Sequence, residues 1–239
     1  MPGGTKVTAS AGAVIAVCGI LALAGCRSPS ALKPTGLPAG RVEGGPVAPP
    51  QAPEAAKPKA EKLEPSVPAG WELRFTETFN RADLGKDWES LEGSWSIEKG
   101  MLSGQGTIMC TRKFPGAQRL EFDAISDNPC DLTGILCANE AGYEGGYFFG
   151  FGSENNAYSK LLIQGAEVKQ YDALITSGKL HHVVCERDGA TLKHIIDGKL
   201  VLTYKDEAPL VGKSHEMIGF YIYTGGKVGN VKVFTKPEK

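Results

Sequence analysis

The chain has 239 residues, with 26 Lys and Arg against 27 Asp and Glu, and its net charge is −1. Such a balance gives no bulk attraction to nucleic acid, so DNA and RNA are excluded as expected partners. Glycine is abundant at 31 residues, and alternating apolar residues take the place of long helix-forming runs. This mixture predicts an all-β protein.

Residues 1–25 have the features of an export signal. Lys6 gives a short basic start, and the most hydrophobic part, residues 13–23, is shorter than the ~20 apolar residues that a transmembrane helix needs. The segment runs into the tetrapeptide Leu-Ala-Gly-Cys, which ends at Cys26 and resembles the bacterial lipobox. In that motif the signal is cut before the cysteine, which then carries a diacylglycerol.

The lipobox resemblance implies that Cys26 is acylated and that a lipid bilayer is a partner. The protein is then an exported, membrane-anchored lipoprotein of the outer-membrane, periplasmic or cell-surface side. An ordinary secretory signal with an incidental cysteine, or an uncleaved anchor, is the alternative.

Residues 26–69 are predicted to be a disordered tether. The stretch from Arg27 to Pro68 holds ten prolines, many alanines and glycines and no aromatic residue. It cannot bury enough apolar surface to offset the entropy lost on ordering. We expect a spacer, and a proline-rich recognition motif is the alternative.

Residues 70–239 are predicted to form one folded domain of short strands. Trp71, Leu73 and Phe75 alternate and open a first strand over residues 71–79. Further strands are expected at 107–113, 118–126, 132–138, 146–152, 158–164, 167–171, 215–224 and 227–235. The strand at 227–235 is expected to lie beside the first one.

Residues 180–204 are predicted to be an antiparallel meander of three strands. The pairs Asp188-Gly189 and Asp197-Gly198 separate its β-rich runs. Asp-Gly between alternating apolar residues favours a type I′ hairpin turn, in which both central residues have positive φ.

The meander is similar to the one found in concanavalin A-like lectin/glucanase and laminin-G-like sandwiches. Residues 79–88 (Phe-Asn-Arg-Ala-Asp-Leu-Gly-x-x-Trp) and 93–102 (Gly-x-Trp-x-Ile-x-x-Gly-x-Leu) resemble the first strands of secreted domains of this kind. The resemblance implies a two-sheet antiparallel jelly-roll sandwich. Trp88 and Trp95 are expected inside it, and sugar-stacking platforms are the alternative.

Four cysteines fall in the expected domain, namely Cys110, Cys130, Cys137 and Cys185. In an oxidising compartment they can form two disulfides in any of three connectivities, and the sequence does not choose among them. Buried thiols are an alternative. Metal binding is less favoured, because the chain has no Cys-x-x-Cys.

Glu121 and Asp123 are predicted to face outward from one strand and to bind sugar hydroxyls, with Tyr143 or Tyr147 bringing an aromatic ring beside them. The stretch resembles the Glu-x-Asp-x-(x)-Glu strand of laminarinase-type glucanases. Ser126 stands where the second Glu would be, so the carboxyl pair needed for retaining hydrolysis is incomplete.

Histidines give a second candidate site. His194 lies on the strand next to His181 and His182 in the meander, so it can meet one of them across the hairpin as a metal or acid/base pair. A packed or solvated histidine is the simpler reading of each.

The stretch 142–152 is rich in glycine and aromatic residues. Tyr147, Phe149 and Phe151 alternate and are expected in the core, although the small residues between them can open a concave surface with Tyr143 at its rim. The loops 127–129 and 153–156 are rich in oxygen ligands that suit Ca²⁺, the one cofactor we consider, and ordinary turn chemistry explains them equally well.

The leading functional hypothesis is a membrane-anchored lipoprotein whose lectin-like sandwich binds a glycan or another cell-envelope component. An enzyme is the first alternative, because domains of the 3-keto-disaccharide hydrolase type, which are hydrolases or lyases, share the opening pattern. Their Asn-Ser-Gly-x-x-x-Arg strand lacks a counterpart, since residues 132–137 carry no Arg. A structural envelope protein without a small ligand is the second alternative.

Overall fold

The computed structural model describes residues 67–129 and 131–238, which are built almost wholly from antiparallel strands. The described part also has a 3₁₀ turn, η1 (Tyr143–Gly145), and a short helical turn, α1 (Ser153–Asn156). In chain order its strands are β1 (Glu72–Glu77), β2 (Trp88–Ser90), β3 (Ser94–Glu98), β4 (Met101–Cys110), β5 (Ala117–Ile125), β6 (Thr133–Ala138), β7 (Tyr147–Gly152), β8 (Tyr158–Ile163), β9 (Ala166–Tyr171), β10 (His181–Asp188), β11 (Thr191–Ile196), β12 (Lys199–Lys205) and β13 (Met217–Lys236).

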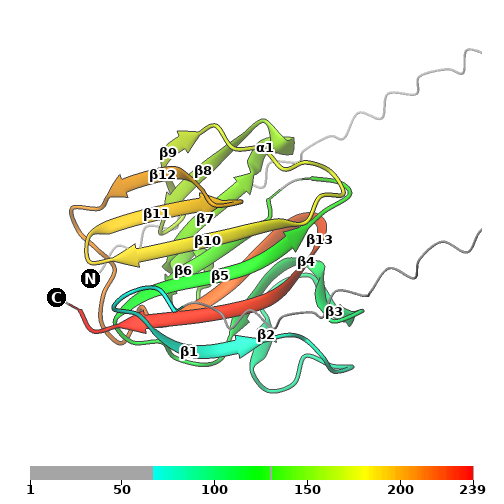
Figure 1. Ribbon diagram of the computed structural model, residues 1–239, viewed down its shortest axis with the longest axis horizontal. Coiled ribbons are helices and arrows are strands. Elements are labelled where there is room, and N and C mark those ends of the chain that lie inside the picture. The colour runs from blue at the N-terminus through cyan, green and yellow to red at the C-terminus, as the bar shows by residue number, and fades with distance from the viewer. Residues whose placement is uncertain (1–66, 130, 239) are drawn as a thin grey trace, which may run out of the picture. The chain divides into compact units, whose positions relative to one another are not determined.

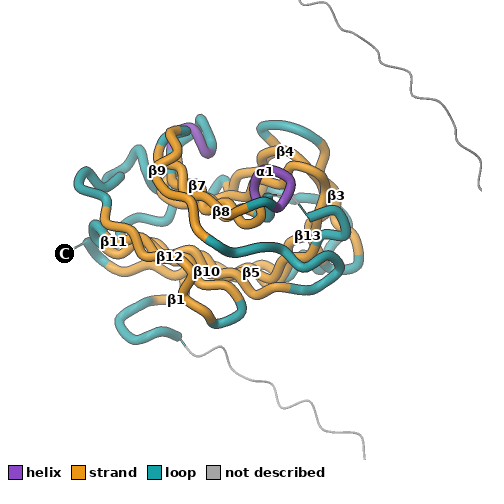
Figure 2. Tube along the Cα trace, turned by 90° about the horizontal axis from the view of Figure 1, so that it is seen from above, coloured by secondary structure: helices purple, strands orange, loops and turns teal. Residues whose placement is uncertain are grey.

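The strands form two layers that share the long strand β13 (Figures 1 and 2). Residues 227–236 of β13 pair with β5 and β1, which gives a first sheet with β12, β11 and β10. Residues 217–221 pair with β6 and β4, which gives a second sheet with β7, β8 and β9. The sequence predicted two separate strands here, and this is wrong. One strand continues through the register shift between Ile222 and Gly226.

The meander is confirmed as β10, β11 and β12. Asp197 and Gly198 have φ of 51° and 78°, so this pair makes the predicted turn with two positive φ values. The other turn differs, because β10 extends through Asp188 and the connection consists of Gly189 and Ala190, of which only Gly189 has positive φ.

The core lies between the two sheets. Trp88 is buried within it and stacks on Phe220 with ring centroids 5.5 Å apart, whereas Trp95 is only partly buried at the edge. Glu72 pairs with Thr235, so the last strand does lie beside the first, as predicted.

Three of the cysteines expected in disulfides are free thiols. Cys110, Cys137 and Cys185 point into the core from three different strands, where burial raises the pKa of the first two to about 11. The expectation of disulfides among these three cysteines is therefore wrong, and they are buried, unreactive thiols. Cys130 lies outside the described residues.

The expected signal and the expected tether up to residue 66, Cys26 included, also lie outside the described residues. Within the described part, no helix combines the length and apolar character needed to cross a membrane.

Candidate functional site

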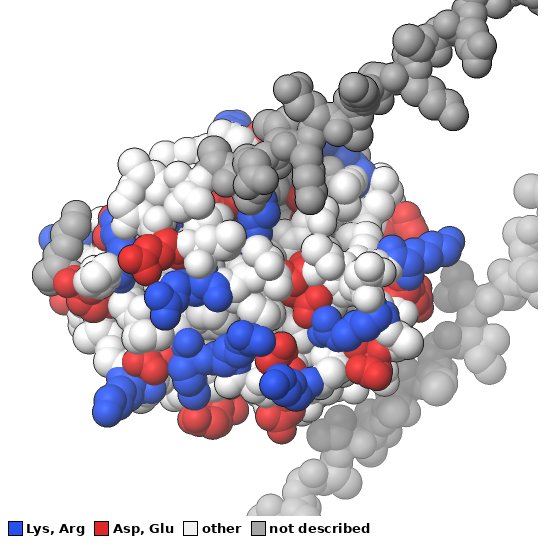
Figure 3. All heavy atoms as spheres, turned by 60° about the horizontal axis from the view of Figure 1, so that its bottom comes forward, with Lys and Arg blue, Asp and Glu red and all other residues white. Residues whose placement is uncertain are grey.

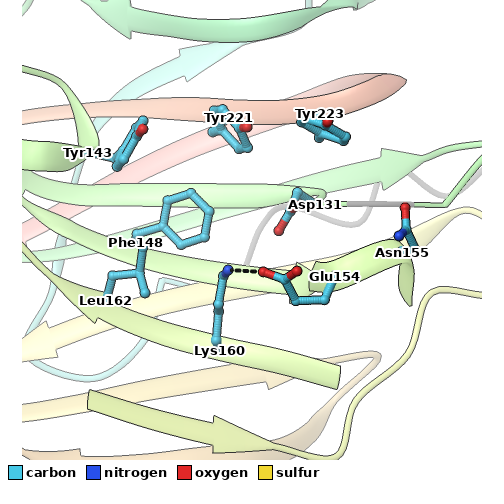
Figure 4. A pocket seen from close by; sticks show the side chains of 9 residues that line it. All are labelled: Asp131, Tyr143, Phe148, Glu154, Asn155, Lys160, Leu162, Tyr221 and Tyr223. Carbon is cyan, nitrogen blue, oxygen red and sulfur yellow. Dashed lines mark hydrogen bonds and ion pairs between the residues drawn. The ribbon is translucent and has the colours of Figure 1, made fainter. Parts of the chain in front are cut away.

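A hollow of about 350 Å³ lies on the outer face of the second sheet (Figure 4). We call it the aromatic hollow. Its lining residues come from β7, β8, β13, η1 and α1 and from the segment before β6, and they are Asp131, Tyr143, Phe148, Glu154, Asn155, Lys160, Leu162, Tyr221 and Tyr223.

Strand alternation explains why aromatic side chains reach this outer face. In β7, Tyr147, Phe149 and Phe151 point into the core, as the sequence predicted, so Phe148 and Gly150 face the other way. The same period places Tyr221 and Tyr223 of β13 outward, because Phe220 and Ile222 are core residues.

The rings form a compact cluster at one end of the hollow. Tyr143, Phe148 and Tyr221 contact one another pairwise, and each pair of ring centroids is 5.5 Å apart. Tyr223 continues the row of tyrosines in Figure 4, and its side chain is 59% exposed. A ligand entering the hollow therefore meets both an exposed ring and ring edges.

The opposite side of the hollow is polar. The ammonium of Lys160 lies 2.9 Å from Oε1 of Glu154, the ion pair drawn in Figure 4. Burial lowers the pKa of Lys160, but the hydrogen bond that its ammonium donates to Glu154 outweighs this and raises it, and the same bond lowers the pKa of Glu154. Both groups are thus charged at neutral pH.

Glu154 and Asn155 reach the hollow because the backbone of α1 is left-handed. Glu154, Asn155 and Asn156 have φ of 51°, 57° and 62°, a conformation that costs roughly 1–2 kcal/mol for an ordinary residue. Asn156 holds the turn in place, because its side-chain amide donates to the carbonyl of Ile175 at 2.9 Å and accepts from its N–H at 2.8 Å. Backbone strain held by surrounding contacts is a frequent property of ligand sites.

The electrostatic environment of the hollow is negative around its tyrosines. Burial, together with the nearby charges of Asp131 and Glu92, raises the pKa of Tyr221 to about 12. The Tyr221 hydroxyl therefore stays protonated and can donate a hydrogen bond.

Tyr143 is the one sequence-predicted ligand residue that the aromatic hollow contains. Tyr147 and His194 are both fully buried in the core, which corrects their assignment to a ligand site. The Tyr147 hydroxyl donates to Asp206 at 2.7 Å, and Nδ1 of His194 lies 2.6 Å from the Tyr171 hydroxyl. Burial lowers the pKa of His194 to about 3, so its ring is neutral.

Glu121, Asp123 and His182 lie together on the outer face of the first sheet. Glu121 pairs with Arg119 at 2.7 Å, and Oδ1 of Asp123 lies 2.8 Å from Nδ1 of His182. The expectation that Tyr143 sits beside the two carboxylates is wrong, because its ring contacts are Phe148 and Tyr221 of the second sheet.

The carboxylates of Glu121 and Asp123 already bind Arg119 and His182. The hydrogen bond from His182 holds the pKa of Asp123 below its usual range, whereas a general acid needs a raised pKa. Nearby, Glu186 bridges Arg119 and Lys193 at 2.6 and 3.0 Å. Opposite charges are likewise interspersed over the face that Figure 3 draws.

His182 and His194 do not form the candidate pair. His182 faces outward beside Asp123, whereas His194 is in the core, and within the described residues no three His, Cys, Asp or Glu side chains converge as metal ligands. In the loop 153–156, where Ca²⁺ binding stays a prediction, Ser153 donates to Asp131, Glu154 binds Lys160 and Asn156 accepts from Ile175. These contacts favour ordinary turn chemistry.

Sequence reasoning missed Lys160, Tyr221 and Tyr223. The two tyrosines carried a usable signal, because residues 218–223 alternate between aliphatic or Phe side chains and Gly or Tyr. Lys160 carried none, since its role depends on a left-handed turn four to six residues before it in the chain.

No protein-family model matches the chain, and no curated protein matches it. Solved structures do resemble it. A Bacillus subtilis protein of unknown function with a galectin-like fold is 13% identical over 69% of this chain and 97% of its own, with a TM-score of 0.55. A non-specific endo-β-1,3(4)-glucanase of family GH16 is 10% identical over 72% of this chain and 93% of its own, with a TM-score of 0.53. Together with the strand pairing, these likenesses confirm the predicted antiparallel jelly-roll sandwich, and at such identities they establish the fold alone.

Proposed function

We propose that this chain is an exported lipoprotein whose sandwich binds a carbohydrate in the aromatic hollow. The observation that carries the proposal is the pairing of exposed and half-buried tyrosine rings with charged and amide side chains across one hollow of about 350 Å³. A sugar presents an apolar face to a ring and hydroxyls to polar groups, so this combination matches its chemistry.

Tyr223 is the proposed stacking platform, since its side chain is 59% exposed at the mouth of the hollow. Lys160 and Asn155 are the proposed hydrogen-bonding partners for sugar hydroxyls. Because the hollow is open and contributes few charged contacts, we expect dissociation constants between millimolar and micromolar, about 4–8 kcal/mol of binding free energy.

A glycan array probed with the full chain, followed by isothermal titration calorimetry with the glycans that bind, tests the proposal. Tyr223→Ala and Lys160→Met should each weaken binding at least about tenfold, which corresponds to about 1.4 kcal/mol. Leu200→Ala is the matched control, because Leu200 is a 52% exposed apolar residue of the first sheet. Failure of every array glycan to bind, or a Tyr223→Ala variant that binds like the parent, would refute the site.

Membrane anchoring through Cys26 is the second part of the proposal, and the lipobox resemblance supports it. Cys26→Ser should move the protein from the detergent-extracted membrane fraction to the soluble fraction. An unchanged distribution between the two fractions would refute the anchoring.

A further inference from the structure

Two smaller hollows adjoin the aromatic hollow and share its tyrosines. One, of about 290 Å³, has Tyr143 as a common wall and is lined by Leu91, Glu92, Ala141 and Glu144 on its far side. The other, of about 210 Å³, has Tyr221 and Tyr223 as common walls and also reaches Glu92. The three hollows therefore surround the row of tyrosines on the outer face of the second sheet.

The far rim of this region is fixed by backbone hydrogen bonds. The N–H groups of Leu91 and Glu92 donate to the carbonyl of Thr107 at 3.0 and 3.1 Å, and Thr107 donates back to Glu92 at 3.2 Å. On the other side, Gly142 packs closely, since a Cβ there would lie 3.2 Å from Leu91. The surface is thus preformed, which lowers the entropy cost of binding an extended ligand.

The adjoining hollows are acidic. Glu92 and Glu144 line them, and no Lys, Arg or His of the described chain does. In the aromatic hollow the charge of Lys160 is already paired with Glu154. A chain of carboxylate- or sulfate-bearing sugars would therefore meet like charge along the whole path.

We propose that the protein binds the interior of an extended, uncharged oligosaccharide, which runs from the aromatic hollow past the tyrosine row toward Glu92, and that it rejects acidic glycans. This inference rests on the proposed function and adds the ligand class. A hollow of about 350 Å³ alone is at the low end of small-ligand pockets, roughly 300–1,000 Å³, and the adjoining hollows of about 290 and 210 Å³ add room beside it for further sugar units.

Calorimetry on the full chain with chain-length series tests the inference. The probes are neutral oligomers of one to six units from β-1,3-glucan, β-1,4-glucan, xylan and mannan, and oligogalacturonates of the same lengths. We expect the Kd to fall at least about tenfold from monomer or dimer to hexamer in a neutral series, and no binding of oligogalacturonates.

Ala141→Trp places a large ring in the hollow of about 290 Å³ that Leu91 and Ala141 line. Because this ring blocks the additional sugar units, the ratio between the dimer Kd and the hexamer Kd should come close to one. Ala166→Trp is the matched control, since Ala166 is exposed at the start of β9 and lines none of the three hollows, so the ratio should persist.

A Kd that does not change with chain length, oligogalacturonates that bind as well as neutral chains, or an Ala141→Trp variant with the parent's ratio would overturn the inference. The first of these leaves the proposed carbohydrate function standing as recognition of a terminal sugar. Failure of every series to bind would overturn this inference, whereas the proposed carbohydrate function falls only if every glycan of the array also fails to bind.

Discussion

Replacing Tyr147 with Phe removes one hydroxyl from the core and leaves the ring in place. That hydroxyl is fully buried, donates to Oδ2 of Asp206 at 2.7 Å and accepts from the N–H of Leu210 at 2.8 Å. In the variant, the carboxylate of Asp206, which is only 7% exposed, loses a charge-assisted hydrogen bond, and the backbone N–H of Leu210 loses its acceptor. We therefore expect Tyr147→Phe to destabilise the fold without touching the ligand site.

The expected loss follows from the two broken bonds. A hydrogen bond to a charged group contributes about 1.5–3 kcal/mol, and a buried donor left unpaired costs about 1–3 kcal/mol, with part of each recovered by relaxation. We expect the unfolding free energy to fall by about 2–4 kcal/mol in total. For a domain of this size this lowers the Tm by roughly 4–16 °C, which differential scanning calorimetry measures directly.

Tyr223→Phe is the matched control, because it removes the hydroxyl of an exposed tyrosine. Its unfolding free energy should stay within about 0.5 kcal/mol of the parent. A Tyr147→Phe variant that melts with the parent would refute the buried bridge between Tyr147, Asp206 and Leu210. Loss of carbohydrate binding in a variant that retains its fold would restore Tyr147 as a ligand residue.

Three further predictions concern titration and backbone geometry. The hydrogen bond to Asp123 raises the pKa of folded His182, so its stabilising contribution is present below the unfolded pKa of about 6.5 and is lost as pH rises through the folded value. His182→Gln should accordingly lower the urea-unfolding free energy more at about pH 5.5 than at about pH 9, and equal losses would contradict this. Burial lowers the pKa of His194 to about 3, so nitrogen NMR should show its ring neutral at about pH 5, and a charged ring there would count against the structure. Gly152 has φ of 73°, and a Cβ would come within 2.5 Å of Ile175. Gly152→Ala should cost about 1–3 kcal/mol of stability and weaken glycan binding, because the turn that follows lines the aromatic hollow; an unchanged thermal melt would disprove it.

The sequence was sufficient to predict the sandwich, because its evidence is local. Alternation along residues 118–126 and 180–204 and an Asp-Gly pair with positive φ specify strands and a hairpin without reference to the rest of the chain. It failed at β13, where two strand-like runs around Gly225 and Gly226 were separated. Only the pairing with β4, β5 and β6 on both sides shows that the chain continues from one sheet into the other.

The ligand residues could not be assigned in the same way. Alternation shows that Glu121 and Phe148 point away from their neighbours in the core, but both sheets of a sandwich have an outer face. Which outer face is hollowed depends on the left-handed turn at Glu154 and on η1, whose placement comes from tertiary contacts. The assignment of Tyr147 to a ligand site was wrong for a related reason. The sequence does not distinguish a tyrosine whose hydroxyl is buried with two hydrogen-bond partners from one whose hydroxyl is exposed.

The two outer faces differ in how far their polar and aromatic side chains are already engaged. On the first sheet, Arg119, Glu186 and Asp123 are each held by an oppositely charged or amide partner, so a sugar there would have to replace bonds that already exist. On the second sheet, Tyr223 is exposed and Tyr143 and Tyr221 are half-buried, so a sugar would cover apolar surface and gain hydrogen bonds at once. The difference between an ion-paired face and an open aromatic one is the physical reason to place the ligand on the second sheet.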